Sequence, residues 1–210
     1  MNREEIHKMV ERYYSEKIKA FGPVPMGVDW NGAASQELRF AELLKINQQL
    51  DHPFSILDFG CGYGAMLDYV MKKATHFNYT GFDISKEMIV AAELAQSMPS
   101  VRWTSSSIDL QEHDYVVASG IFNVREQIQD IDWEQYIFET LSRINSLSKK
   151  GFAFNMLSLY SDVKKRKDNL YYASPVNLFH YCKSTFSNSV ALLHDYPLYE
   201  FTILVRKDIL

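Results

Sequence analysis

Asp58-Phe59-Gly60-Cys61-Gly62-Tyr63-Gly64 is the stretch that decides the fold, because it joins an apolar run, residues 54–59, to a stretch of helical spacing, residues 65–74. It therefore predicts a buried strand, a tight turn and a helix. Glycines at alternate positions of the turn allow positive φ angles and let a ligand approach the backbone with no Cβ in the way. A second apolar run, residues 77–83, ends on Asp83. We expect that carboxylate to lie beside the turn, where it can accept both hydroxyl groups of a ribose.

The alternation of strand and helix continues along the chain. Further strands are predicted at residues 101–108, 114–122 and 151–159, and further helices at residues 85–98 and 132–148. An alternating order of this kind is typical of a parallel sheet with helices on both faces. We therefore expect an α/β fold whose first five strands are parallel.

The C-terminal part departs from that order. A helix is predicted at residues 175–185, followed by two strands, residues 189–195 and 200–206, with only residues 196–199 between them. A parallel pair needs a crossover of about a dozen residues or more, so this link implies an antiparallel hairpin. The predicted fold class is a three-layer, Rossmann-like α/β architecture with a mixed seven-stranded sheet, parallel through five strands and closed by the hairpin.

Residues 1–52 precede the first strand and are too few to form a domain of their own. They contain a predicted helix, residues 33–50, and a proline- and glycine-rich segment, residues 22–27. We expect one domain, residues 1–210, in which residues 1–52 form an N-terminal helical extension that acts as a lid.

Composition argues against several classes of protein. The 22 lysines and arginines are outnumbered by 26 aspartates and glutamates, which argues against a chain built to bind nucleic acid. No run of about 18 apolar residues is present, and the first residues lack the apolar core of a signal peptide. The two cysteines, Cys61 and Cys182, have no metal-ligand spacing. We expect a cytoplasmic protein with reduced thiols that uses no metal and binds neither nucleic acid nor membrane.

Two nucleotide ligands suit the glycine turn. Gly60-x-Gly62-x-x-Ala65 matches a dinucleotide-binding fingerprint, since alanine is tolerated at the third glycine position. The alternative is S-adenosylmethionine, which carries no phosphate and lays its amino-acid end across the turn. The long extension ahead of the turn argues against a short-chain dehydrogenase.

Residues 54 to 207 resemble the class I S-adenosylmethionine-dependent methyltransferases. The resemblance rests on Asp58, the alternate glycines that follow it, Asp83 and the C-terminal antiparallel hairpin. The resemblance implies that the turn cradles the methionine part of the cofactor, that Asp83 holds the ribose and that Ile84 covers one face of the adenine. The cofactor-binding residues implied for the turn are Asp58, Gly60, Cys61, Gly62 and Gly64.

Other candidate positions follow from the same resemblance. Many relatives carry an aspartate at the end of the third strand, where this chain has Ser107 and then Ile108, so we expect Ser107 or backbone to contact the adenine. The end of the fourth strand offers Ser119 to the cofactor and Asn123 to the acceptor. Such strand ends line the ligand crevice of an open α/β sheet.

Polar and aromatic residues of the extension supply the remaining candidates. Arg39 could pair bidentately with the carboxylate of the methionine moiety. Tyr14 and Trp30 are candidates for the wall of the cofactor or acceptor pocket.

The function predicted is methyl transfer from S-adenosylmethionine to a nitrogen or oxygen atom of a small-molecule acceptor. The sulfonium already activates the methyl group, so the protein mainly orients the acceptor and excludes water. The catalytic residues stay unassigned, because spacing singles out none of the histidines as a general base. Two alternatives stay open: a non-catalytic S-adenosylmethionine-binding subunit or sensor, and an NAD(P)-dependent oxidoreductase.

Overall fold

The predicted mixed sheet is formed in the order β3-β2-β1-β4-β5-β7-β6. Its strands are β1 (Phe54–Phe59), β2 (Phe77–Phe82), β3 (Val101–Thr104), β4 (His113–Ser119), β5 (Ser148–Leu157), β6 (Ser189–Leu193) and β7 (Glu200–Arg206). β1 pairs in parallel with β2 and β4, whereas β7 runs antiparallel to both β5 and β6. This arrangement, seen in a computed structural model that describes residues 1–30 and 32–207, confirms the predicted fold class.

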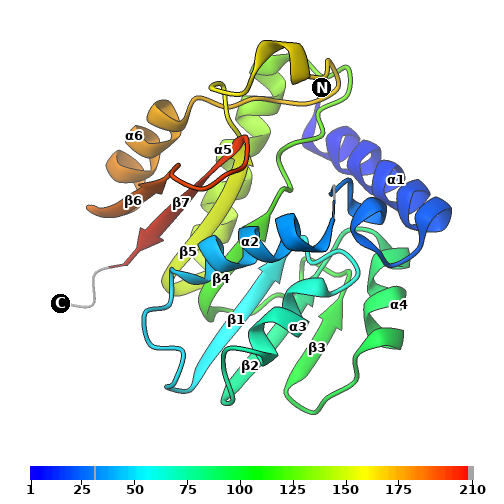
Figure 1. Cartoon of the computed structure of the whole chain (residues 1–210), viewed down its shortest axis with the longest axis vertical. Coiled ribbons are helices and arrows are strands. Elements are labelled where there is room, and N and C mark those ends of the chain that lie inside the picture. Colours follow the sequence, from blue (N-terminus) through cyan, green and yellow to red (C-terminus); the bar gives the residue numbers. More distant parts are fainter. Residues whose placement is uncertain (31, 208–210) are drawn as a thin grey trace.

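Helices surround this sheet (Figure 1). They are α1 (Arg3–Phe21), α2 (Ala33–Leu44), α3 (Ala65–Met71), α4 (Lys86–Ala95), α5 (Asp130–Leu147) and α6 (Pro175–Thr185), with short 3-10 turns η1 (Pro25–Val28) and η2 (Val163–Lys165). Within the described residues no helix is long and apolar enough to cross a bilayer.

Most expected elements end a few residues earlier than their sequence pattern indicates, and the difference is largest for β3 and α2. β3 stops at Thr104 because the Thr104 hydroxyl accepts a hydrogen bond from the backbone N–H of Ser106 and so bends the chain. α2 stops at Leu44, and the Asn47 carboxamide then accepts from the backbone N–H of Gln49. In both places a short polar side chain competes with the backbone ladder, a competition that hydrophobic periodicity does not report.

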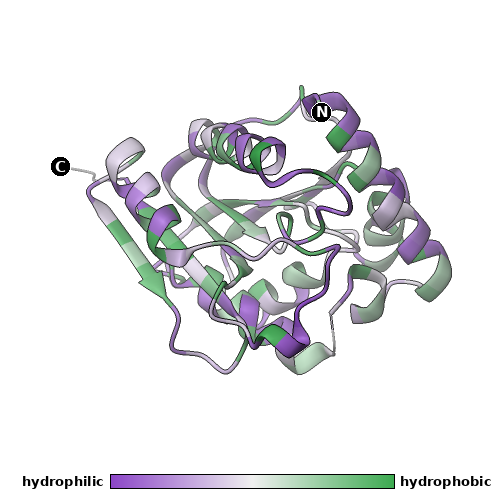
Figure 2. Ribbon diagram, turned by 90° about the horizontal axis from the view of Figure 1, so that it is seen from above, coloured by the Kyte–Doolittle hydropathy of each residue, from purple (hydrophilic) through white to green (hydrophobic). Residues whose placement is uncertain are grey.

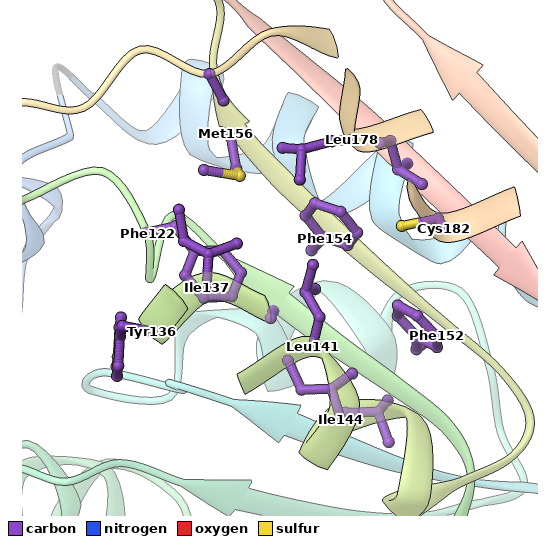
Figure 3. Packing of buried hydrophobic residues seen from close by; sticks show 14 of the residues in the cluster. Phe122, Tyr136, Ile137, Leu141, Ile144, Phe152, Phe154, Met156, Leu178 and Cys182 are labelled. Carbon is purple, nitrogen blue, oxygen red and sulfur yellow. The ribbon is translucent and has the colours of Figure 1, made fainter. Parts of the chain in front are cut away.

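Successive strand residues face two separate apolar cores. In β1, for example, Leu57 belongs to one core and Ile56 to the other. The larger core joins the sheet to α5 and α6, and Figure 3 shows its packed side chains, among them Leu141, Phe154 and Leu178. The smaller core lies under α2 and α3. Hydrophilic residues gather on the outer faces of the helices (Figure 2), so the sheet is buried on both sides.

Helix α1 is an element that the sequence pattern did not predict. It begins with a capping box, in which the Asn2 side chain accepts from the Glu5 N–H and the Glu5 carboxylate accepts from the Asn2 N–H. The helix is rich in charged residues, and its few buried residues include the apolar Ile6 and Val10. α1 lies beside α4 (Figure 1), where the hydroxyls of Ser15 and Ser85 are 2.9 Å apart. The N-terminal extension therefore reaches the carboxyl ends of β1 and β2.

Candidate active site

A pocket lies at the carboxyl ends of β1, β2 and β4, where open α/β sheets bind their ligands. Most of the residues proposed from the sequence line it, namely Tyr14, Trp30, Asp58, Gly60, Cys61, Gly62, Asp83, Ile84 and Ser119. Other lining residues come from the same segments and from α2 and α5, including Val28, Gln36, Phe59, Tyr63, Gly120, Ile121 and Tyr136. The extension and the sheet thus contribute to a single cavity.

The glycine turn is held by backbone bonds to β2. The N–H groups of Gly60 and Cys61 donate to the Phe82 carbonyl over 2.7 and 2.9 Å. Gly60 has φ +85°, and a Cβ there would lie 2.3 Å from Ile121 Cγ2. Glycine is required at this position for its backbone angle and for close contact with the loop after β4.

Asp83 faces the pocket from the end of β2. Its two carboxylate oxygens accept from the backbone N–H groups of Gly62 and Ser85, both over 2.9 Å. Burial raises the pKa of Asp83 to about 6, against the opposing effect of these two hydrogen bonds. Each oxygen keeps a second lone pair for a ligand hydroxyl. The carboxylate is therefore fixed in position and able to accept further hydrogen bonds.

Asp58 is the second carboxylate of the pocket. Its side chain is 2% exposed and accepts a 2.6 Å hydrogen bond from the Tyr79 hydroxyl. Burial, against the opposing hydrogen bond from Tyr79 and with a smaller contribution from the neighbouring Asp83, raises the pKa of Asp58 to about 7. A cationic ligand group beside Asp58 would favour the ionised form.

The loop after β4 forms another side of the pocket. The Gly120 N–H donates to Asn155 Oδ1 over 2.7 Å, which ties the loop to β5. The Ser119 hydroxyl is buried and has no hydrogen-bond partner among the described residues. A buried hydroxyl without a partner costs free energy, which a ligand bound beside Ser119 could recover.

Residues of the N-terminal extension form a further wall of the pocket. Tyr14 of α1, Val28 of η1 and Trp30 all line it. Burial raises the pKa of Tyr14, so its hydroxyl stays protonated near neutral pH, and no described residue hydrogen-bonds to it. Asp29 holds the intervening turn against α1, accepting hydrogen bonds from Tyr13 over 2.5 Å and from Lys17 over 2.6 Å.

Five expected site residues do not line this pocket: Gly64, Ser107, Ile108, Asn123 and Arg39. Gly64 has φ +89° and begins α3, packed against Trp103. Ser107 and Ile108 lie beyond the end of β3, and the Ile108 side chain is 91% exposed. Asn123 is buried, and its side-chain oxygen accepts from the Leu157 N–H over 3.1 Å, so it joins the β4 loop to β5.

Arg39 is a correction to the expectation that it pairs with a cofactor carboxylate. It does not line the pocket, and its Nε donates to both carboxylate oxygens of Glu200, over 3.0 and 2.8 Å. Its Nη1 donates to the Ser35 carbonyl. Because the Glu200 carboxylate lies 161 residues away, no local pattern could reveal that this arginine already has an anionic partner.

Val28, Ile121 and Tyr136 are pocket residues that sequence reasoning missed. They come from three separate segments, and each follows the pattern of ordinary packing. Tyr136 even belongs to the apolar stripe of α5, where it also contacts the larger core. The spacing of neighbouring residues therefore held no signal for their role.

Comparisons with known proteins identify the fold and the family. The family described as a methyltransferase domain matches residues 57–151. The Mycobacterium tuberculosis protein Rv1506c, which carries the name of a methyltransferase, is 52% identical over 156 residues, 74% of this chain and 94% of its own length. This chain belongs to the class I S-adenosylmethionine-dependent methyltransferase family.

Solved methyltransferase structures share the fold at low sequence identity. Magnesium protoporphyrin IX methyltransferase from Synechocystis, with bound S-adenosylhomocysteine, has a TM-score of 0.66 at 13% identity, covering 95% of this chain and 99% of its own. Human N-acetylserotonin methyltransferase, in complex with S-adenosylmethionine, has a TM-score of 0.63 at 16% identity. The match to the human enzyme covers 99% of this chain, which spans 60% of the length of the human chain.

Proposed function

We propose that this methyltransferase binds S-adenosylmethionine in the described pocket and transfers its methyl group to a nitrogen or oxygen atom of a small-molecule acceptor. The observation that carries the proposal is Asp83, a carboxylate fixed at the end of β2 beside the glycine turn by the N–H groups of Gly62 and Ser85. A carboxylate at this place suits the two hydroxyls of a ribose. The cofactors of both solved neighbours carry such a ribose.

The remaining lining residues support one orientation of the cofactor. Its amino-acid end would lie over Gly60 and Gly62, and its ammonium group near Asp58 would favour the ionised carboxylate. Ile84 follows Asp83 in the chain and would cover the adenine. Ser119, which lacks a partner, would face the methionine end from the loop after β4.

Aromatic side chains line much of the pocket, among them those of Tyr14, Trp30 and Tyr136, and no histidine, lysine or arginine is found among the described lining residues. A sulfonium methyl group needs an acceptor held in line with the S–CH₃ bond, about 3 Å away, in a site from which water is excluded. This lining supports a small acceptor that reaches the site as a neutral amine or an ionised oxygen.

Residues 1–52 act in this proposal as a lid on a single domain. Tyr14 lies ahead of the segment 22–30 and Trp30 is its last residue, and both line the pocket. Withdrawal of the segment would open the cavity, and its return would exclude water from the transfer.

The test is a transfer assay with methyl-labelled cofactor across amines, phenols and carboxylates, read by mass spectrometry. We expect a labelled product with one acceptor class, and calorimetric binding of S-adenosylhomocysteine. Binding without any transfer, including to cell extract, would favour the non-catalytic subunit or sensor. Thermal stabilisation by NAD and none by S-adenosylhomocysteine would overturn the proposal in favour of an oxidoreductase.

A further inference from the structure

A buried ion pair lies immediately behind the pocket wall. Arg39 of α2 and Glu200 of β7 are 6% and 1% exposed. In addition to the two bonds from Nε, Arg39 Nη2 donates to Glu200 Oε1 over 2.5 Å. The forked contact, together with the Nη1 bond to the Ser35 carbonyl, fixes the plane of the guanidinium.

The guanidinium contacts the indole of Trp30. Arg39 Cζ is 3.8 Å from the centroid of the Trp30 ring, a cation–π contact. The indole also packs on Gly120, where a Cβ would lie only 2.4 Å from it. Trp30 is therefore held between the guanidinium and the loop that ends β4.

Stability alone is a weak reason for such an ion pair. Desolvation of two charges offsets much of their attraction, and well-packed apolar residues often serve the fold as well. Lysine would preserve the charge but lacks the flat guanidinium that stacks on a ring. The geometry thus indicates a role for the planar group that faces Trp30.

We propose that Arg39 and Glu200 are positioning residues: Glu200 fixes the Arg39 guanidinium, and the guanidinium holds Trp30 against Gly120 as a wall of the cofactor pocket. Neither residue lines the pocket itself, so both act through Trp30. The inference rests on the proposed function for the identity of the ligand, and on the geometry alone for the position of Trp30.

A double-mutant cycle tests the coupling. We expect Arg39→Lys and Trp30→Leu each to weaken binding of S-adenosylhomocysteine by about 10-fold, and the double variant to bind no more weakly than Trp30→Leu alone. Arg206→Lys is the matched control, because its Nη2 donates to the Lys45 carbonyl and it lies outside this pocket. Additive losses, or an unchanged affinity in Arg39→Lys, would overturn the proposal.

Fluorescence provides a readout that needs no ligand. The Trp30 signal is the difference between each protein and its Trp30→Phe counterpart, since the chain has three tryptophans. We expect Arg39→Lys to shift this signal to the red and to increase its quenching by acrylamide, whereas Arg206→Lys leaves it unchanged. An unchanged Trp30 signal in Arg39→Lys would refute positioning.

The two readouts also separate this inference from the proposed function. If the wild-type protein fails to bind S-adenosylhomocysteine but its Trp30 signal responds to Arg39→Lys, the ligand assignment fails and the positioning role stands. If Arg39→Lys does not fold, the pair Arg39→Met with Glu200→Leu removes both buried charges together. This double variant must show the same red shift and the same increase in quenching of the Trp30 signal. An unchanged Trp30 signal would count against the proposal.

Discussion

The glycine turn, residues 58–64, and the N-terminal cover, residues 1–44, meet in one pocket but are held in place by different interactions. Backbone bonds fix the turn: Gly60 and Cys61 donate to the Phe82 carbonyl, and Gly62 donates to Asp83. Side chains hold the cover, through apolar packing in both cores and through pairs between distant segments. Ser15 contacts Ser85 across 70 residues of chain, and Arg39 pairs with Glu200 across 161.

This difference separates what is rigid from what can move. A turn bonded through its own backbone to the neighbouring strand changes only if the sheet itself opens. The segment 22–30 of the cover is held to α1 through partly exposed side chains, so it can detach at lower free-energy cost than α1 or α2, whose apolar residues are buried in the two cores. The half of the pocket that the glycine turn forms is therefore preformed, while its outer wall depends on a small number of replaceable residues.

The largest expected effect concerns the buried attachment of the cover. Glu200→Ala leaves the Arg39 guanidinium buried without its partner, and we expect it to lower the free energy of unfolding by about 3–5 kcal/mol. The matched control is Glu42→Ala, since the partner of Glu42, Lys45, has a 52% exposed side chain. We expect the control to lose about 1 kcal/mol or less in urea titrations. Equal losses would mean that the Arg39–Glu200 pair has no special part in holding α2.

A further effect on stability is expected at Asp58, the buried carboxylate at the start of the turn. Its pKa is raised to about 7 by burial, so the folded state keeps a proton that the unfolded state loses near its ordinary value of 3.8. This contribution to stability is complete below pH 3.8 and is lost as the pH rises to about 7. Asp58→Asn has no such loss, and we expect it to exceed wild-type stability by up to about 4 kcal/mol at pH 8 but not at pH 4.

Unfolding free energies of the two proteins at pH 4, 6 and 8 check this expectation. Asp114→Asn is the control of opposite sign, because hydrogen bonds from Ser55 and the Lys150 charge hold the pKa of Asp114 below its usual value, against the opposing effect of burial. That variant should lose stability relative to wild type above pH 4. A difference between Asp58→Asn and wild type that does not change with pH would contradict the burial argument.

A smaller effect is expected on ligand affinity at Asp83. Asp83→Asn removes a charged acceptor, and we expect calorimetry to show S-adenosylhomocysteine binding weakened by about 1.5–3 kcal/mol, or roughly 10- to 100-fold. Because the pKa of Asp83 is raised to about 6, wild-type affinity should also fall as the pH drops below 6, and this fall should be absent in the variant. Asp114→Asn, which also alters a carboxylate that accepts a backbone N–H, should bind normally. Unchanged affinity in Asp83→Asn would assign this residue to the turn structure alone.

The turn could be predicted from the sequence because the residues that determine its conformation are adjacent in the chain. Gly60 and Gly62 stand out by residue type, and Asp83 by its place at the end of an apolar run. The cover could not be predicted in the same way. α1 is dominated by charged residues, and its attachment depends on contacts such as Ser15 with Ser85 that only the fold brings together. The sequence predicts that Arg39 pairs with the carboxylate of the cofactor, and it gives no sign of the actual partner, Glu200, which lies on the last strand.

The smallest expected effect concerns the segment 22–30, which joins α1 to α2. Asp29 holds this segment through Tyr13 and Lys17. Asp29 has φ +60°, a conformation that asparagine also adopts readily, so Asp29→Asn keeps the backbone and an acceptor for Tyr13 but loses the ion pair with Lys17. We expect limited proteolysis within residues 22–30 of the free protein to become about two- to fivefold faster, in line with a partly exposed pair worth roughly 0.5–1 kcal/mol.

Saturating S-adenosylhomocysteine should suppress this cleavage in both the wild type and Asp29→Asn, because a lid closed over a ligand must open before a protease can reach it. Glu4→Gln is the matched control. It breaks an exposed ion pair with Lys8 on α1, away from the segment 22–30, and should leave the cleavage rate unchanged. Cleavage that is equally fast with and without ligand would show that the segment moves independently of the pocket. Residues 1–52 would then have no gating role.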